Sequence, residues 1–541
     1  MTDANQAPET AKVSPSAISG AEELLGLTFT DAERQLMAED VAEQRDSYAA
    51  IRAVALDNSV PPAVRFDPRL PDAVFPLARK PIVRSTVELP PIPANLEELA
   101  FAPLTVLAKL IETRQITSTA LTQMYLSRLK RYDPLLHCVV TLTEELALQQ
   151  AKRADEEIAQ GRYRGPLHGI PYGAKDLLAT RQHPTTWGAE PFVDQKFDYD
   201  AAVIEKLEEA GAVLVAKLTL GALAWGDVWF GGMTRTPWNL EEGSSGSSAG
   251  SGSATAAGLV GFAIGTETYG SIISPSTQCR ISGLRPTFGR VSRYGAMALS
   301  WTMDKIGPMC RTVEDCALVF AAIYGADARD NTTVDYPFNW DATQDLSALR
   351  IGYEKSAFEE DSPYKARSNE ALEKLRSLGL ELLPLELPKL PIPALSIILT
   401  AEAGAAFDEL TRSGRDDLLK RQSRDAWPNV FRASRLIPAV EYLQAQRVRT
   451  LLMQEMATLL TDVDVYVSPS FSPNLLLTNL TGHPSVVVPC GVTDDHKPAS
   501  VTFSANLYQE AAALRVALAY QNATDYHQPH PVIAAAGDDG D

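Results

Sequence analysis

The sequence has few cysteines, and they follow no metal-binding or disulfide pattern. Five cysteines are scattered over 541 residues, and no two of them form a CxxC pair. An odd and irregular set argues against a disulfide framework and against a structural zinc site. We therefore expect reduced and mostly buried cysteines at Cys138, Cys279, Cys310, Cys316 and Cys490.

An excess of basic residues and long apolar runs are lacking as well. Lys and Arg together number 49 against 68 Asp and Glu, which leaves a formal net charge of −19. Because binding to a phosphate backbone depends on clustered Lys and Arg, this composition predicts that nucleic acid is not a partner. No stretch approaches eighteen consecutive apolar residues, and the amino terminus lacks the pattern of a secretory signal. The sequence thus predicts a cytoplasmic protein without a membrane contact.

Composition divides the chain into three regions. Residues 1–95 are predicted to form an N-terminal arm, with a disordered start to about residue 20, a helix from the capping box at Thr30 to about Ala53, and a proline-rich extended segment. Residues 96–532 are dense in helical and strand patterns and are predicted to form one catalytic body, which the arm wraps or flanks. Residues 533–541 are predicted to be a flexible acidic tail.

Within the body, a helical pattern, a glycine and a strand pattern follow one another repeatedly. In residues 201–217 the helical pattern ends near Gly211 and a β-branched run follows. Residues 368–388 repeat this order, and residues 349–355 read as a strand before it. This alternation is typical of layered proteins and predicts an α/β fold.

Residues 243–253, GSSGSSAGSGS, contain only Gly, Ser and Ala. One interpretation is a flexible linker, although the residues on both sides belong to the same α/β pattern. A second interpretation is the nucleophile elbow G-x-S-x-G at residues 246–250. That elbow needs a preceding strand, which NLEEG (residues 239–243) is not expected to form. It also needs a late histidine, to be found among His483, His496, His527 and His530.

A third interpretation joins the serine-rich run to two other stretches. GPLHGIPYGAKDLLAT places Lys175 directly after a short apolar segment, which favours a buried lysine, whereas the alternative is a surface lysine paired with Asp176. GTETYGSIISPSTQC, residues 265–279, holds three serines within six residues. Each stretch alone is a weak indication of function.

Together, the three stretches resemble the motifs of the amidase signature family. The G-x-P-x-x-x-K-D motif resembles residues 169–176, the G-G-S-S-G-G-S motif residues 245–251, and the G-T/S-D-x-G-G-S-I motif residues 265–272. Ser271 follows Ser247 by 24 residues (271 − 247), and Ser247 follows Lys175 by 72 (247 − 175), as is usual in the family. The resemblance covers residues 97 to 532 and implies a single large three-layer α/β/α domain with a central mixed β-sheet. It implies no metal and no cofactor.

The resemblance assigns a role to each motif residue. It makes Ser271 the nucleophile, Ser247 the bridging serine and Lys175 the base, with a cis peptide bond between Gly246 and Ser247. A serine needs an adjacent base, and a lysine with the ordinary pKa of about 10.4 is protonated near neutral pH, so burial must lower its pKa. The resemblance further implies an oxyanion hole and substrate contacts. The oxyanion hole would use the backbone N–H groups of Thr268, Tyr269, Gly270 and Ser271, and the substrate contacts would come from Tyr269, Gly246 and Ser248.

Two residues depart from the family pattern. Tyr269 stands where most members have glycine, and Ile273 stands where they have arginine. We expect an ordinary φ at Tyr269, with its side chain in or beside the substrate pocket. Without the arginine, Glu267 needs another arrangement. Either Arg280 or Arg285 replaces the missing partner, or Glu267 is neutral or accepts backbone hydrogen bonds.

The resemblance predicts an amidase that hydrolyses the C–N bond of a small-molecule amide through an acyl-enzyme on Ser271, as a monomer or homodimer. Cleavage of esters or carbamates by the same acyl transfer stays open. One alternative is the amidotransferase subunit that releases ammonia from glutamine for transamidation of misacylated tRNA; the long arm, the acidic balance, Tyr269 and Ile273 count against it. The other alternative is a non-catalytic binding protein, against which the retained lysine and serines argue.

Overall fold

The computed structural model describes residues 13–71 and 73–534 of the chain. At its centre lies a mixed sheet of eleven strands. The pairs β3–β2, β2–β8, β13–β11 and β11–β12 are parallel, and the other neighbours are antiparallel. In spatial order the strands are β1 (Val139–Leu142), β3 (Val213–Leu218), β2 (Pro171–Lys175), β8 (Phe262–Glu267), β10 (Lys305–Cys310), β9 (Ser282–Arg285), β14 (Ser485–Val492), β15 (Pro498–Ala505), β13 (Val465–Pro469), β11 (Ile351–Glu354) and β12 (Leu382–Leu385).

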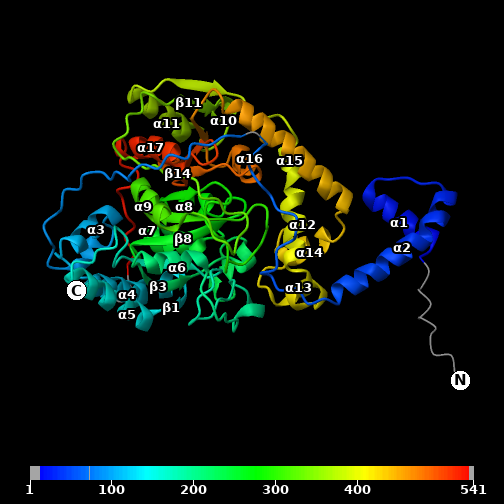
Figure 1. Ribbon diagram of the computed structural model, residues 1–541, viewed down its shortest axis with the longest axis horizontal. Helices are drawn as coiled ribbons and strands as arrows, with labels where there is room; N and C mark the ends of the chain where they lie inside the picture. The colour runs from blue at the N-terminus through cyan, green and yellow to red at the C-terminus, as the bar shows by residue number, and fades with distance from the viewer. Residues whose placement is uncertain (1–12, 72, 535–541) are drawn as a thin grey trace.

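Helices cover both faces of the sheet (Figure 1), so the predicted three-layer α/β/α fold is confirmed. On one face α7 (Ala249–Ala256) packs on β2 and β8, and α8 (Ile273–Gln278) packs on β9 and β14. On the other face α9 (Val313–Ile323) packs on β10, and α17 (Glu510–Asn522) packs on β14 and β15. The three motifs singled out in the sequence therefore lie around one sheet.

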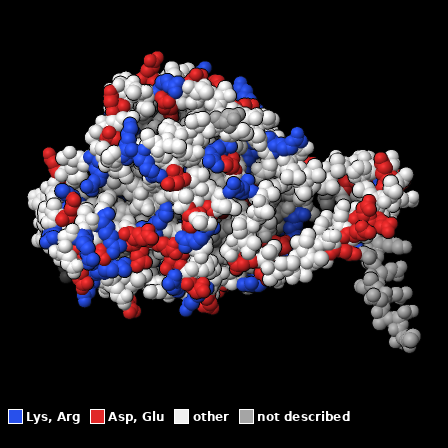
Figure 2. All heavy atoms as spheres, in the orientation of Figure 1, with Lys and Arg blue, Asp and Glu red and all other residues white. Residues whose placement is uncertain are grey.

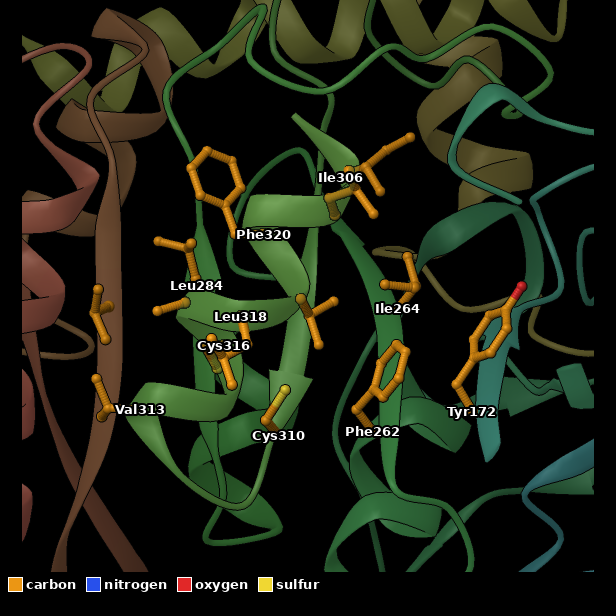
Figure 3. Packing of buried hydrophobic residues seen from close by; sticks show 14 of the residues in the cluster. Tyr172, Phe262, Ile264, Leu284, Ile306, Cys310, Val313, Cys316, Leu318 and Phe320 are labelled. Carbon is orange, nitrogen blue, oxygen red and sulfur yellow. The ribbon is translucent and has the colours of Figure 1, made fainter. Parts of the chain in front are cut away.

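Strand alternation divides the core between these two faces. Phe262 and Ile264 of β8 join a buried cluster with Phe320 of α9, which Figure 3 shows from close by. Ala263 between them belongs to a second cluster, with Ala254 of α7. Because successive side chains of a strand point to opposite faces, large residues fill the α9 side and small ones admit α7 on the other.

The remaining elements complete the layers and the periphery. The other α-helices are α1 (Pro15–Leu25), α2 (Asp31–Arg52), α3 (Leu104–Glu112), α4 (Ser118–Leu136), α5 (Glu144–Ala159), α6 (Ala202–Glu209), α10 (Lys355–Glu359), α11 (Lys365–Ser377), α12 (Ile397–Ala406), α13 (Asp408–Arg412), α14 (Trp427–Ser434), α15 (Ala439–Leu459) and α16 (Asn474–Thr481). Two small sheets pair β4 (Val228–Trp229) with β5 (Gly232–Met233) and β6 (Arg235–Thr236) with β7 (Asn239–Gly243). Short 3-10 helices are η1 (Leu96–Leu99), η2 (Glu190–Phe192), η3 (Ala222–Ala224), η4 (Ile392–Ser396) and η5 (Arg415–Leu418).

The residues before η1 form a helical hairpin and an extended segment. α1 and α2 pack on each other and project from the body (Figure 1). The chain then runs along the body, where Phe75 packs edge-on against Tyr508 with ring centroids 4.7 Å apart. Further on, Val83 forms an isolated β-bridge with Asp341. The extended segment thus lies against the body, whereas the predicted boundaries of arm, body and tail stay a prediction.

Of the local predictions for the arm, one is confirmed and one is wrong. The capping box is confirmed: Glu33 N donates to Thr30 Oγ1 at 3.3 Å, Thr30 N donates to Glu33 Oε2 at 2.6 Å, and α2 ends at Arg52. The predicted disorder to about residue 20 is wrong from Pro15 onward. There α1 begins, because the Ser14 side chain caps it and Pro15 starts it with a fixed φ. Residues 1–12 and most of the predicted tail, 535–541, lie outside the described residues.

The expectation for NLEEG is also wrong, since residues 239–243 form β7. This strand pairs with β6 in a separate two-stranded sheet and is not part of the central sheet. Its polar composition misled the prediction, because an exposed strand of a small sheet needs backbone pairing more than apolar side chains. No elbow of the α/β-hydrolase kind results, since β7 does not lead from the central sheet into the serine run.

The surface carries charges of both signs. Figure 2 shows acidic and basic side chains side by side over the body, with an acidic group on the α1–α2 hairpin. All five cysteines are free and buried, as predicted. Among the helices of the described ranges, none combines the length and the apolar character needed to cross a bilayer.

Candidate active site

Lys175 is the last residue of the interior strand β2, and its side chain is fully buried. Strands β3 and β8 flank β2 on either side, both parallel to it. The Lys175 Nζ lies 2.7 Å from the hydroxyl of Ser247, 2.9 Å from that of Thr266 and 3.0 Å from that of Ser248. The lysine is therefore in the interior, and its near partners are hydroxyl groups and not the neighbouring Asp176.

Burial holds the pKa of Lys175 well below the ordinary lysine value, against the opposing charges of Asp304 and Glu267. An amine removed from water favours its neutral form, because the charged form loses its hydration. A neutral amine has a free lone pair, which can accept a proton from an adjacent hydroxyl. Burial thus favours the neutral form of Lys175, which is the form that a general base requires.

The Gly/Ser/Ala run is part of the buried core. The Gly246–Ser247 peptide bond is cis, as the resemblance implies. All eight residues of α7, which follows directly, are buried. A Cβ atom on Gly250 would overlap the carbonyl oxygen of Cys138 and the backbone nitrogen of Thr219. Small residues thus let the run approach the central strands and bring Ser247 to the lysine, and the linker interpretation is wrong.

Ser271 lies in the turn between β8 and α8. Its carbonyl oxygen accepts a hydrogen bond from Ser248 N at 3.2 Å, which ties this turn to the serine run. Ser271 is 8% exposed and Ser247 only 1%, so Ser271 has the more accessible side chain. The structure thus gathers the three predicted residues from β2, from the run before α7 and from this turn.

The same turn presents a row of backbone donors. Within the described residues, none of the N–H groups from Thr268 to Ser271 donates to a protein acceptor. Gly270 has a φ of +85°, which glycine adopts without strain, whereas φ at Tyr269 is not positive. The ordinary φ predicted at Tyr269 is confirmed. Unpaired N–H groups in a fixed turn can stabilise a developing oxyanion.

Glu267, the last residue of β8, is fixed by several donors that we call the Glu267 clamp. Arg285 forms an ion pair with its carboxylate at 2.8 Å, and both side chains are fully buried. Asn479 Nδ2 donates to it at 2.8 Å, and the backbone N–H groups of Ile272 and Ile273 donate at 2.8 and 3.0 Å. Burial alone raises the pKa of Glu267, but the Arg285 charge and these hydrogen bonds lower it to about 2. The clamp fixes the start of α8 and with it the Ser271 turn.

A cavity of about 490 Å³ lies next to the site; Thr266 and Thr268 line it, whereas Lys175, Ser247 and Ser271 do not. Thr266 brings the cavity near Lys175, because its hydroxyl lies 2.9 Å from the Lys175 amine. Thr268 belongs to the turn with the free N–H groups, and its hydroxyl donates to Asp304 at 2.5 Å. Its volume falls in the range of small-molecule sites, roughly 300–1,000 Å³. Its outer walls include residues 293–299, residues 328–332 and part of the arm. Within the described part of the chain, no three His, Cys, Asp or Glu side chains are grouped to hold a metal ion.

The three residues predicted to contact the substrate differ in position. Tyr269 is 45% exposed and does not line the cavity. The Ser248 hydroxyl is buried and accepts a hydrogen bond from Thr266 N at 3.1 Å, and Gly246 packs against the carbonyl of Gly226. Their contact with a substrate stays a prediction.

Sequence reasoning missed several residues that shape the site. Asp304 accepts a hydrogen bond from Thr268, which lies 36 positions earlier in the sequence. Asn479 donates to Glu267, which lies 212 positions earlier. Their positions in the sequence carry no local pattern that would have found them. The same is true of the arm residues in the cavity wall, which contact the body only through the fold.

Comparison with known proteins gives consistent matches. The sequence model of one family, described as Amidase, matches residues 120–514. A glutamyl-tRNA(Gln) amidotransferase subunit from Methylococcus capsulatus is 34% identical over 475 residues, which are 79% of this chain and 97% of the relative. The corresponding subunit from Chloroflexus aurantiacus is 35% identical over 485 residues, 81% of this chain and 99% of the relative. The solved structure of a native peptide amidase from Stenotrophomonas maltophilia has a TM-score of 0.69 at 28% identity, over 78% of this chain and 97% of that chain.

These relatives contradict the prediction that nucleic acid is not a partner and that the chain acts as a monomer or homodimer. Both curated relatives are named as one subunit of an amidotransferase, and the name includes a tRNA. The prediction rested on the net charge of −19 for this chain. That charge is the wrong basis for a subunit, because another subunit can supply the basic surface that a tRNA requires.

The Glu267 clamp predicts a pH dependence of stability. Since the folded-state pKa of about 2 lies below the ordinary 4.5, the ionised carboxylate stabilises the fold above about pH 4.5, and this contribution is lost as the pH falls toward 2. We expect Glu267→Gln to be less stable than the native chain at pH 7, with a difference that shrinks below pH 4.5. Urea unfolding at pH 7, 5 and 3.5 measures this.

Glu354→Gln is the matched control, because burial raises the pKa of Glu354 to about 7 and its neutral form already prevails in acid. Its stability difference from the native chain should be small at pH 5 and should not shrink further toward pH 3.5. A difference for Glu267→Gln that stays constant from pH 7 to 3.5 would contradict the role assigned to the clamp.

Proposed function

Because the chain belongs to the amidase signature family, we propose that it cleaves the C–N bond of a carboxamide through an acyl-enzyme on Ser271. In this proposal Ser271 is the nucleophile, Ser247 bridges, and Lys175 is the base. The observation that carries it is the buried Lys175 amine, 2.7 Å from the Ser247 hydroxyl. A buried lysine surrounded by hydroxyl groups has little structural value, because burying the amine costs free energy that apolar packing would not.

In the first half of the reaction, the Ser271 oxygen attacks the amide carbonyl carbon. Its proton passes to Ser247 while Ser247 gives its own proton to the neutral Lys175 amine. The carbonyl oxygen becomes an oxyanion that the N–H groups of residues 268–271 would stabilise, at about 3 kcal/mol per donor. The free donors of this turn support that assignment.

Collapse of the tetrahedral intermediate breaks the C–N bond. The proton held by Lys175 returns through Ser247 to the leaving nitrogen, which departs as an amine or as ammonia. In the second half, water takes the place of Ser271 as nucleophile and gives its proton to the same base. The products are the carboxylic acid and the free enzyme, so one relay serves both halves.

For the substrate, the leading candidate is glutamine, with release of ammonia as one subunit of an amidotransferase. Both curated relatives reported above carry that name, and they match over 97% and 99% of their own length. The ammonia would then serve transamidation of a misacylated tRNA by the assembled complex. Under this candidate, tRNA and further subunits are partners of the chain.

A stand-alone amidase that acts on a peptide amide or another small amide is the second candidate. The similarity to a peptide amidase favours it. A second observation also favours it. Residues 58–65 line the cavity, and they precede the region matched by the family model, which begins at residue 120. The same acyl transfer would also cleave esters or carbamates.

Substitution of the nucleophile tests the chemistry. Ser271→Ala should lower kcat by about a thousandfold or more, because the residues of such a relay act as a unit. It should also abolish labelling by a fluorophosphonate, which peptide mapping locates. Ser276→Ala is the matched control, since this serine is buried in α8 with no hydrogen-bond partner for its hydroxyl among the described residues. Full amidase activity in a folded Ser271→Ala variant, or a label on another residue, would contradict the proposal.

Ammonia release distinguishes the two substrate candidates. If glutamine is the substrate, the chain alone should release ammonia from it slowly, and addition of the remaining subunits and misacylated tRNA should raise the rate by about tenfold or more. If the chain is a stand-alone amidase, it should turn over peptide amides alone and gain nothing from those partners. Lys175→Met should be inactive in both assays. Full rates with glutamine in the absence of partners would contradict the leading candidate.

A further inference from the structure

We propose that arm residues 58–65 form the outer wall of the substrate cavity and bind the distal, apolar part of the substrate. The inference rests on the proposed function, because it takes the cavity beside Lys175 as the substrate site. It assigns a role in specificity to a segment that precedes the residues matched by the family model. The ligand class it predicts is a carboxamide with an apolar or aromatic group beyond the scissile bond, which favours the second substrate candidate.

The arm contributes a continuous part of the cavity lining, which we call the arm wall. Its lining residues are Asn58, Ser59, Pro61, Pro62, Val64 and Arg65. The facing wall from the body includes Tyr294, Met297 and Trp301. Pro61, Pro62 and Val64 thus place apolar, solvent-exposed surface on one side of the cavity, opposite Tyr294, Met297 and Trp301, and an apolar ligand group would bury this surface on binding.

Asn58 fastens the arm wall to the body. Its Nδ2 donates to the carbonyl oxygen of Ala298 at 2.9 Å, and its Oδ1 accepts from Ala298 N at 2.8 Å. Ala298 itself lines the cavity. This two-point contact fixes both the distance and the orientation of the arm relative to the facing wall.

The other end of the arm wall has anchors of its own. Arg65 donates to the carbonyl oxygen of Asn331 at 2.6 Å, and the guanidinium of Arg449 lies 3.5 Å from the ring centroid of Phe66. Between the two ends, Pro61–Pro62 restricts the backbone, since each ring fixes φ. The segment is therefore held at both ends and has few conformations between them, as a preorganised binding surface requires.

The charged residues around the cavity are mostly committed to the protein. Arg293 pairs with Asp330 at 3.3 Å, and Arg329 pairs with Glu205 at 2.6 Å. Lys305 is different, because its buried amine lines the cavity with no hydrogen-bond partner among the described residues, but burial holds its pKa well below the ordinary value and so favours the uncharged amine. These groups offer little free charge to a ligand, which leaves the apolar surface of the arm wall as the main contact for the distal part.

Asn339 provides a matched control for Asn58. It holds the arm at residues 78–80 by the same two-point geometry, with Nδ2 donating to Ala78 O at 2.9 Å and Oδ1 accepting from Lys80 N at 2.8 Å. Asn339 does not line the cavity. Asn339→Ala therefore loosens the arm to a similar degree without touching the wall.

The test compares the rates at which two fluorophosphonates label Ser271 in the full chain, one with a methyl group and one with a phenylalkyl group. In Asn58→Ala, loss of two hydrogen bonds should lower the rate constant for the phenylalkyl probe about tenfold and leave the methyl probe within about twofold. In Asn339→Ala both rate constants should stay within about twofold. Val64→Ser, a change at an exposed side chain that preserves folding, should lower the phenylalkyl rate about threefold.

Equal loss for both probes in Asn58→Ala, no loss for either, or the same selective loss in Asn339→Ala would overturn the inference. Should Asn58→Ala fail to fold, an unchanged phenylalkyl rate in Val64→Ser would overturn it instead. Failure of the proposed function has a different outcome, because neither probe would then label Ser271 in the native chain.

Discussion

The arrangement of the site depends on keeping one amine out of water and away from carboxylates. Lys175 ends an interior strand and meets three hydroxyl groups within 3.0 Å. A carboxylate in contact with it would stabilise the ammonium form and remove the base. The next residue, Asp176, is paired instead with Lys217 at 2.8 Å, with both side chains fully buried. Asp176 lies in the turn that follows β2, and its ion pair with Lys217 of β3 keeps its carboxylate away from the Lys175 amine.

The hydroxyl groups reach this amine because two other constraints act on the backbone. Small residues allow α7 to lie against the central strands, where a Cβ on Gly250 would already overlap its neighbours. The Glu267 clamp joins the end of β8 to the first N–H groups of α8 and so fixes the turn that carries Ser271. Close packing on one side and a buried ion pair on the other therefore hold the serines that the chemistry needs.

The sequence allowed prediction of what depends on local pattern, and not of what depends on distant contacts. The motifs around Lys175, Ser247 and Ser271 are short and ordered, so the fold class and the gathering of these residues followed from them. Arg280 and Arg285 were equal candidates for Glu267, but only Arg285 lies on β9, within reach of it, while Arg280 stacks on Trp238 at 4.2 Å. The contact between Asn58 and Ala298 spans 240 positions and left no trace in composition. The absence of a nucleic-acid partner was wrongly predicted, because net charge describes one chain and not an assembly.

The central claim is that burial makes Lys175 a base near neutral pH, and the pH dependence of kcat/KM for amide cleavage tests it most directly. A base must be neutral to act, so activity should rise with pH through a midpoint set by the free enzyme's Lys175. The account predicts a midpoint well below the ordinary lysine pKa of about 10.4. A midpoint near 10.4 would mean that Lys175 remains a hydrated ammonium, and it would contradict the account.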